Sequence, residues 1–476
     1  MGSSKLRLAG GFRMLRIYNT LTNAKEEFHP IEEGVVRLYT CGPTVYDYAH
    51  IGNFRTFVFQ DLFRRYLHYH KYRVIHVMNI TDVDDRIIQN AHAQGMSLKD
   101  YTTKYTEAFF EDSKTLHIEL PELMPYATDH IPEMVALIKR LEAKGLTYCK
   151  DGSIYFSITR FPGYGKLSKA DFSGIQAGAR IDTDRYDKDN ARDFALWKAS
   201  KEGEDFWETE IGPGRPGWHI ECSAMSMKYL GESFDIHCGG IDLVFPHHEN
   251  EIAQSEGATG KPFVHYWVHP EFLIVDGEKM SKSLGNQFTL RDLLAKGVSP
   301  EVLRYLFLSV HYRKQLNFTP DALRQTQASI QRLEDFVQRL KEMADTPEPC
   351  QCFAAEVEEA RQRFIEAMDD DLNTSAALAV VFDFVRSTYL KVDHKRLSGG
   401  DARAALGFVQ EIDKVFAVLR TQPELLDEEI QRQIEARQQA RRRREFAEAD
   451  RIRKWLLSKG IQLEDTRDGT RWKRSR

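Results

Sequence analysis

Long apolar runs, a secretory signal and paired cysteines are all missing from this sequence. No apolar stretch approaches the roughly 20 residues that cross a bilayer, and the first dozen residues lack the apolar core of a signal peptide. The 476 residues include only 6 cysteines and no Cys-x-x-Cys pair. These absences argue against a membrane-spanning protein, a disulfide scaffold and a metal site built from one local motif. We therefore expect a cytoplasmic protein with reduced thiols, in which any metal site draws on distant segments.

Charge is distributed unevenly along the chain. The net charge is −5, but residues 431–476 carry 15 Lys and Arg against 7 Asp and Glu, which leaves −13 on the first 430 residues. A basic end on an acidic body indicates one polyanion-binding end. A solvated, charged helix would have the same composition. Hydrophobic residues make up 42% of the chain, which allows several cores.

A strand–helix–strand pattern occupies part of the first 80 residues. Val35–Thr40 has the composition of a strand, apolar residues then recur at helical spacing from about His50 to Tyr66, and Arg73–Ile80 is a second strand-like run. Such a unit predicts an α/β fold whose catalytic domain is a doubly wound parallel sheet of the Rossmann type. Ligands of such sheets bind at the carboxyl ends of the strands.

Beyond this unit the pattern changes twice. Residues 132–212 interrupt the α/β pattern and contain short strand-like pieces such as Ser153–Ser157, so we expect an insertion there. Beyond about residue 325 the periodicity is helical, which predicts a bundle followed by a small C-terminal domain. The pair Gly399-Gly400 predicts a turn between two helices of that bundle.

His50-Ile51-Gly52-Asn53 stands where the first strand should pass into the helix. A helix start offers free N–H groups and the positive end of the helix dipole, and a glycine lets a ligand approach the backbone. A histidine there can donate to a phosphate. The alternative is a capping histidine beside a turn glycine.

Lys279-Met280-Ser281-Lys282-Ser283 is a second candidate for phosphate chemistry. Two lysines and two hydroxyls on a loop can stabilise the charge that develops on a triphosphate as it reacts. Exposed Lys/Ser loops are common and mostly have no such role. The combination with an upstream His-Ile-Gly element in a βαβ context favours the functional interpretation.

A possible metal site can also be assembled from separate segments. His247 and Glu251 are four residues apart and share one face if helical, and Cys41 and Cys222 are expected near strand ends. Two thiolates, an imidazole and a carboxylate suit zinc. Spacing alone leaves Cys238, His248 and Glu249 as rival ligands, and a lone buried cysteine is more often a small core residue.

Two strings, His50–Asn53 (the first signature) and Lys279–Ser283 (the second signature), resemble the signature strings of class I aminoacyl-tRNA synthetases. Other segments resemble the cysteine-specific family of that class. These segments are Cys41–Asp47, Asn79–Asp85, Gly214–Ser223, Gly239–Glu251 and Asp371–Thr374. The resemblance runs from about residue 14 to the C-terminus. It implies a ligase of protein biosynthesis that activates L-cysteine with ATP and transfers it to the 3′ end of tRNA(Cys).

The resemblance also implies roles for individual residues. The ligands that it selects for one zinc ion are Cys41, Cys222, His247 and Glu251. The residues that it places at ATP, which binds with Mg²⁺, are His50, Gly52, Asn53, Lys279 and Lys282. In the substrate pocket it places Trp218 against cysteine and Thr81 near the amino group. The first signature commonly ends in a second histidine; Asn53 keeps an N–H donor but supplies no charge.

Zinc would answer the problem of telling cysteine from serine. One small group in an apolar pocket is worth only about 1–3 kcal/mol, whereas a discrimination of about 10⁴–10⁵ needs roughly 5.5–7 kcal/mol. A zinc ion that takes the substrate thiolate as a further ligand lowers the thiol pKa and prefers soft sulfur to a hydroxyl. The insertion looks too short to be an editing domain.

The resemblance divides the chain into predicted domains and suggests a monomer. Residues 1–13 would be a tag or a disordered extension. The predicted domains are a Rossmann-type catalytic domain (14–131 and 213–265), a connective insertion (132–212), a signature-loop and stem-contact region (266–325), a helical bundle (326–422) and a basic anticodon-binding domain (423–476).

Two alternative functions remain at this stage. One is a related ligase that passes cysteine from the same adenylate to an amino sugar, as in mycothiol synthesis. The other is a silent relative that only binds nucleic acid. The basic helical end argues against the first, and the intact Lys279–Ser283 string argues against the second.

Overall fold

A parallel four-stranded sheet forms the centre of the larger part of the chain. The computed structural model describes residues 14–169, 193–201, 203–281, 283–346, 353–394, 397–419, 428–458, 461–466 and 469–474. The chain divides into two compact units, Met1–Leu419 and Arg420–Arg476. Among the described residues, no helix combines the length and apolar character that crossing a bilayer requires.

The central sheet has the strand order β10-β9-β3-β4, and each neighbouring pair is parallel. Its strands are β3 (Val35–Thr40), β4 (Arg73–Met78), β9 (Phe234–Cys238) and β10 (Val264–Val268). Helix α1 (Ile51–Tyr69) connects β3 to β4, which confirms the predicted βαβ unit. The second strand ends two residues earlier than predicted, because its partner strand β3 ends at Thr40, which pairs with Met78.

Both faces of this sheet are buried, as expected of a doubly wound fold. Along β3, Val36 and Leu38 face the core that contains α1, whereas Tyr39 faces a second core beneath α5 (Trp218–Leu230). The alternation follows from the two-residue period of a strand. It brings helices from distant parts of the chain to the same strand ends.

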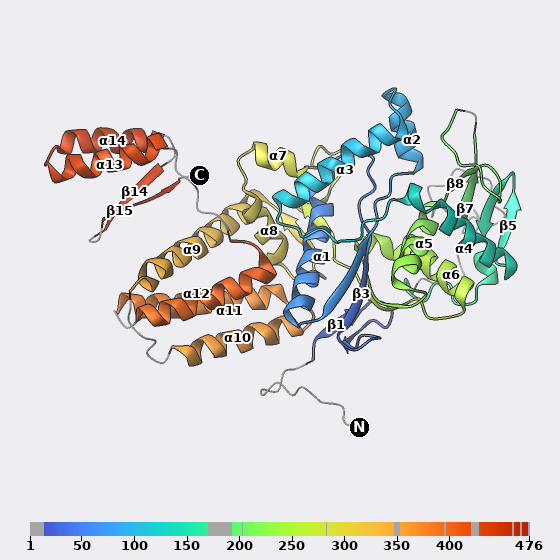
Figure 1. Ribbon diagram of the computed structural model, residues 1–476, viewed down its shortest axis with the longest axis horizontal. Helices are drawn as coiled ribbons and strands as arrows, with labels where there is room; N and C mark the ends of the chain where they lie inside the picture. Colours follow the sequence, from blue (N-terminus) through green and yellow to red (C-terminus); the bar gives the residue numbers. More distant parts are fainter. Residues whose placement is uncertain are drawn as a thin grey trace. The chain divides into compact units, whose positions relative to one another are not determined.

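Segments between residues 147 and 216 form an antiparallel sheet with the order β5-β6-β7-β8, so this sheet extends from the predicted insertion into the segment that follows it. Its strands are β5 (Thr147–Lys150), β6 (Ser153–Phe156), β7 (Phe194–Ala199) and β8 (Gly214–Pro216). Helices α4 (Ile131–Ala143) and α6 (Glu249–Thr259) pack beside α5. In Figure 1 these elements lie on one side of the central sheet, and the helices α9–α12 lie on the other.

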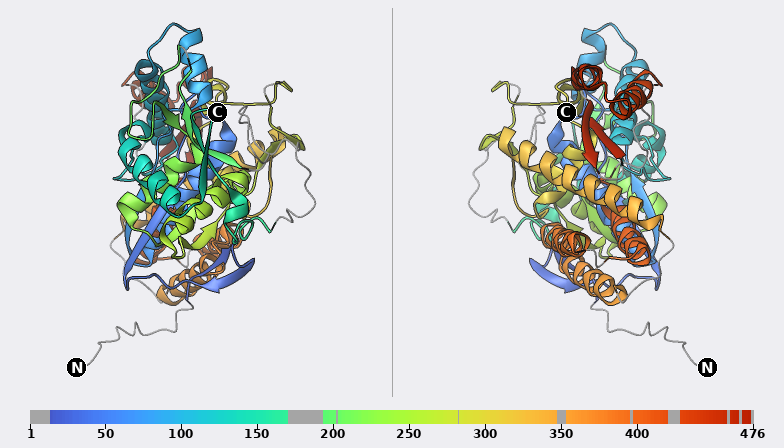
Figure 2. Two further views of the ribbon diagram at one scale, coloured as in Figure 1. Left: turned by 90° about the vertical axis from the view of Figure 1, so that its right-hand side faces the viewer. Right: turned by 90° about the vertical axis from the view of Figure 1, so that its left-hand side faces the viewer.

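A small sheet and a helical bundle follow. The small sheet has the order β12-β11-β13, with β11 (Leu273–Val275), β12 (Glu278–Lys279) and β13 (Leu316–Phe318). The bundle helices, seen from two further sides in Figure 2, are α9 (Pro320–Ala344), α10 (Ala354–Asp369), α11 (Thr374–Asp393) and α12 (Gly399–Phe416). The predicted glycine turn is wrong in one detail. Gly399 and Gly400 lie in the first turn of α12, because the N-cap Ser398, in a capping box with Asp401, starts the helix at Gly399.

In the described residues of the smaller unit, two helices are followed by a hairpin. These are α13 (Glu428–Arg442), α14 (Phe446–Ser458), β14 (Ile461–Thr466) and β15 (Gly469–Arg474). Its apolar core includes Ile434, Ile452, Leu456 and Ile461. The unit contains all 15 Lys and Arg of residues 431–476.

Candidate active site and metal centre

The four residues implied as zinc ligands come together at the carboxyl end of the central sheet. Cys41 directly follows β3, Cys222 lies near the start of α5, His247 is the second-last residue of a π-helical turn (Val244–His248), and Glu251 lies in the first turn of α6. Their ligand atoms all lie within 4.8 Å of one another. None of the four is more than 8% exposed. Four distant segments therefore converge on one buried point.

A second group of donors overlaps the first. It keeps Cys41 and Glu251 but replaces the other two residues with His237 and His248. His248 Nε2 lies 3.3 Å from Cys41 Sγ, and His237 Nε2 lies 2.9 Å from Glu251 Oε2. Sequence reasoning considered His248 but missed His237, whose only signal is a histidine inside a buried strand.

The other two rival ligands have different roles. The Cys238 side chain packs in the core that contains α1, and burial holds the pKa of its thiol well above the usual value. The Glu249 carboxylate accepts backbone N–H groups of Gly165, Leu167 and Ser168, so it holds a loop of the insertion. Neither belongs to a four-donor group among the described residues.

The two thiols of the first group differ in acidity. A hydrogen bond from Cys41 and the facing His247 lower the pKa of the Cys222 thiol to about 6, while burial raises the pKa of Cys41 well above its usual value. Burial would lower the pKa of His247, but Glu251 and Cys222 outweigh burial and raise it to about 10. The pocket thus favours a thiolate and is ready to accept a cation.

Glu251 shows how well a metal ion would fit. Burial disfavours its charge, but His237 and His247 outweigh burial and hold its pKa below the usual value. His237 donates to Oε2, whereas the buried Oε1 lies 3.1 Å from His247 Nε2 outside hydrogen-bond geometry. Oε1 thus has an ion-pair contact with His247 but no hydrogen bond, so its lone pairs remain available to a metal ion. Two thiols, an imidazole and this carboxylate therefore match the donors that zinc prefers.

The two implied pocket residues lie against the same centre. The Trp218 indole stacks on the His247 ring with centroids 4.2 Å apart, and the residue is 39% exposed, so one side remains open to a ligand. Thr81 follows β4 and is buried. Its hydroxyl accepts from Asn79 and donates to Glu221 Oε2 at 3.0 Å. Sequence reasoning gave no role to Asn79 or Glu221.

The first phosphate signature caps α1. His50 is the N-cap: its Nδ1 accepts the backbone N–H of Asn53, and Asn53 Oδ1 accepts the backbone N–H of His50, both at 3.1 Å. Asn53 therefore completes a reciprocal cap. An added Cβ at Gly52 would lie 2.6 Å from the terminal methyl of Met280, so a larger residue there would displace the end of that side chain.

The second signature lies beside the first. The backbone N–H of Ile51 donates to Phe288, and Met280 packs on Gly52. Lys279 ends β12, and its Nζ lies 5.2 Å from the centre of the Phe272 ring. Asn286 bridges the loop by accepting from Ser281 N and donating to Lys279 O. Lys282 lies outside the described residues.

Comparisons with known proteins agree with this arrangement. Residues 27–328 match the model of the class I (C) tRNA synthetase catalytic domain, and residues 363–420 match the DALR domain. A cysteine–tRNA ligase of Solibacter usitatus is 57% identical over 97% of this chain and 99% of its own length. One of Koribacter versatilis is 50% identical, with the same coverage of both chains.

The fold has distant relatives among solved structures. Mycobacterium tuberculosis methionyl-tRNA synthetase, solved in complex with methionyl-adenylate, has a TM-score of 0.61 and 16% identity, over 80% of this chain and 92% of that one. At that identity the likeness concerns the fold.

Proposed function

Since the chain belongs to the cysteine–tRNA ligases, a family of class I aminoacyl-tRNA synthetases, we propose that it selects cysteine at a zinc ion held by Cys41, Cys222, His247 and Glu251. The enzyme activates cysteine with ATP and transfers it to tRNA. The observation that carries the zinc proposal is the convergence of these four buried donors within 4.8 Å.

The protein surroundings prepare this centre for sulfur. When bound, zinc would offer a soft Lewis acid that favours a thiolate over a neutral hydroxyl. His237 fixes one oxygen of Glu251, and His219 Nδ1 lies 2.9 Å from His247 Nδ1, so the ligand side chains are held in place from outside. Trp218 would cover the bound cysteine, and the Asn79–Thr81–Glu221 chain would orient the Thr81 hydroxyl near its amino group.

ATP would bind with Mg²⁺ between the two signatures. The cysteine carboxylate attacks the α-phosphate, and pyrophosphate leaves. His50, the Gly52 and Asn53 backbone at the start of α1, Lys279 and Lys282 would stabilise the charge that develops on the phosphates. A terminal ribose hydroxyl of the tRNA then attacks the adenylate carbonyl and displaces AMP. No protein nucleophile is required, so the rate depends on positioning and electrostatics.

Further predictions concern the partners and the setting. We propose tRNA(Cys) as the acceptor, with the basic unit Arg420–Arg476 binding the anticodon end through phosphate contacts and base stacking. A cytoplasmic monomer remains our prediction from the sequence.

The decisive test is transfer of radiolabelled cysteine to bulk tRNA in the presence of ATP and excess serine. We expect acid-precipitable label that serine does not reduce. The variant Cys222→Ala should lose at least about 100-fold in charging and should also lose bound zinc. Cys238→Ala is the matched control, because this cysteine is equally buried but packs on the α1 side of the sheet; it should keep both.

Other outcomes would count against the proposal. Full zinc content and charging in Cys222→Ala would overturn the ligand assignment. Cysteine-dependent pyrophosphate exchange without label on tRNA would indicate the small-acceptor ligase. The full-length identity to tRNA ligases, which includes the C-terminal unit, does not favour that alternative.

A further inference from the structure

Arg55 connects the two phosphate signatures from inside the protein. It lies two residues after Asn53 on α1, and its side chain is only 2% exposed. Its guanidinium donates to the backbone carbonyls of Glu271, at 2.7 Å, and of Phe272 and Lys314. Burial lowers the pKa of Arg55 to about 10, so the group stays charged at neutral pH.

The three carbonyl groups belong to the two segments that lead into the small sheet. Residues 269–272 join β10 to β11, and residues 310–315 join α8 (Pro300–Ser309) to β13. Strand β11 pairs with both β13 and β12. Because β12 ends at Lys279, the carbonyl groups that Arg55 holds lie at the base of the sheet that carries the second signature.

A direct path also leads from Arg55 to the signature lysine. The Phe272 carbonyl accepts from Arg55, and the Phe272 ring lies 5.2 Å from Lys279 Nζ. A cation over an aromatic face is attracted to it. Arg55 therefore fixes the residue on which Lys279 rests, while the same helix begins at His50.

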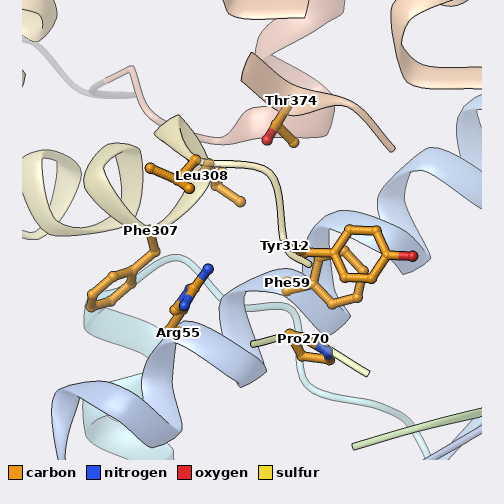
Figure 3. A pocket seen from close by; sticks show the side chains of 8 residues that line it. Arg55, Phe59, Pro270, Phe307, Leu308, Tyr312 and Thr374 are labelled. Carbon is orange, nitrogen blue, oxygen red and sulfur yellow. The ribbon is translucent and has the colours of Figure 1, made fainter. Parts of the chain in front are cut away.

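The surroundings of Arg55 leave no room for a substrate. Figure 3 shows its side chain beside a cavity lined by Phe59, Pro270 and Thr374 among others. The cavity volume is about 10 Å³, which admits at most a single water. This cavity is too small for a substrate, and the hydrogen bonds of Arg55 to three backbone carbonyls support a role in holding the backbone.

We propose that Arg55 is a positioning residue for ATP activation: by holding the Glu271, Phe272 and Lys314 carbonyl groups it sets the distance between His50 and Lys279. The inference rests on the proposed placement of both signatures at the phosphates. A planar fork that reaches three acceptors is a property of arginine that lysine cannot reproduce. A displacement of about 1 Å between catalytic groups can cost about 100-fold in rate.

The test compares Arg55→Lys with Arg64→Lys in the full-length enzyme. Arg64 lies on the same helix, is 6% exposed and also holds two backbone carbonyls, those of Glu119 and Leu120. Its remaining hydrogen bond goes to Glu122, not to a described residue of either signature. We expect Arg55→Lys to lower kcat for cysteine-dependent ATP–pyrophosphate exchange about 10- to 100-fold, with the KM for cysteine and the zinc content unchanged. Arg64→Lys should stay within about threefold of the parent enzyme.

Local hydrogen exchange separates positioning from general destabilisation. Peptides covering β11 and β12 should exchange faster in Arg55→Lys and not in Arg64→Lys. Phe272→Leu keeps the backbone carbonyl but removes the ring beneath Lys279, so it should lower kcat about 3- to 10-fold even if the arginine variant folds poorly. The inference would be overturned if Arg55→Lys and Arg64→Lys had the same rate of pyrophosphate exchange. It would also be overturned if Arg55→Lys lost zinc in parallel with its loss of rate.

Pyrophosphate exchange also distinguishes a failure of this inference from a failure of the signature assignment on which it rests. If His50→Ala and Lys279→Ala both leave pyrophosphate exchange unchanged, the signature assignment fails, and the inference fails with it. If those variants lose activity while Arg55→Lys and Phe272→Leu do not, the signature assignment stands and only the role proposed for Arg55 is wrong.

Discussion

The metal centre and the phosphate signatures are built on opposite principles. At the metal centre all four donors are at most 8% exposed and stand at the ends of strands or at helix starts, with neighbouring histidines holding them. At the signatures, His50 is half-buried and Lys279 is exposed at the end of a two-residue strand. The metal centre is buried and held by several hydrogen bonds, whereas the signatures are partly open to solvent.

The difference suits the two recognition tasks. Choosing sulfur over oxygen requires donors that cannot relax around the wrong ligand, because relaxation would restore the binding of serine. Neutralising a phosphate needs charges that can approach it after ATP has entered. Damage to one region should therefore leave the chemistry of the other intact, and the following predictions test that separation.

The largest effect is expected from Lys279→Ala. Removing a cation that acts on the charge developing in the transition state costs about 10²- to 10³-fold in kcat, here for pyrophosphate exchange. The KM for cysteine and the zinc content should not change. Lys296→Ala is the control, since this exposed lysine also lies over an aromatic ring, 4.6 Å from the centre of Phe288. Loss of zinc in Lys279→Ala would break the separation of the two regions.

The sequence predicts the Rossmann-type unit well because its signals are local. The strand at Val35–Thr40 and the helix after His50 follow from apolar periodicity over fewer than 20 residues each, and both are observed. The glycine turn at Gly399 was misplaced because capping by Ser398 and Asp401 begins α12 earlier than its two glycines suggest.

The site was only partly within reach of sequence reasoning. Cys41, Cys222, His247 and Glu251 are separated by up to 210 positions, and spacing could not choose them over His248 or Cys238; the family resemblance made that choice. The residues that hold the ligand and pocket side chains from outside were not predicted. His237, His219 and Glu221 act through contacts across the fold, between strands and helices that only the three-dimensional arrangement brings together.

A smaller effect is expected when one of these outer hydrogen bonds is removed. His237→Phe keeps a ring against Trp267, where the centroids now lie 4.6 Å apart, but removes the donor to Glu251. Loss of such an outer partner typically costs about 10- to 100-fold in metal affinity, measurable by competition with a zinc chelator, while the KM for ATP should not change. His76→Phe, at a buried histidine of β4 bonded to Thr40, is the control. Complete loss of zinc binding would instead favour the donor group that contains His237 and His248.

The smallest effect concerns how the metal side of the site is anchored. Asp85 holds Arg215, three residues before Trp218, at 2.6 Å and also pairs with Lys198. Burial would raise the pKa of Asp85, but the two cations outweigh it and lower that pKa. The carboxylate therefore stabilises the fold above its unfolded pKa of about 3.9, and this contribution is lost as the pH falls through the lower folded value.

Asp85→Asn should accordingly lower the midpoint of thermal unfolding by about 1–2 °C at pH 7, the effect of roughly 1 kcal/mol in the unit Met1–Leu419. The difference from the parent enzyme should be smaller at pH 3 than at pH 7, because the contribution of the carboxylate is progressively lost below its unfolded pKa of about 3.9. The control is Glu210→Gln, which breaks an exposed pair with Lys139 and should change little at either pH. If Asp85→Asn lowered the unfolding midpoint equally at both pH values, Asp85 would act by packing. The segment around Arg215 and Trp218 would then be held by side-chain packing rather than by the charge of Asp85.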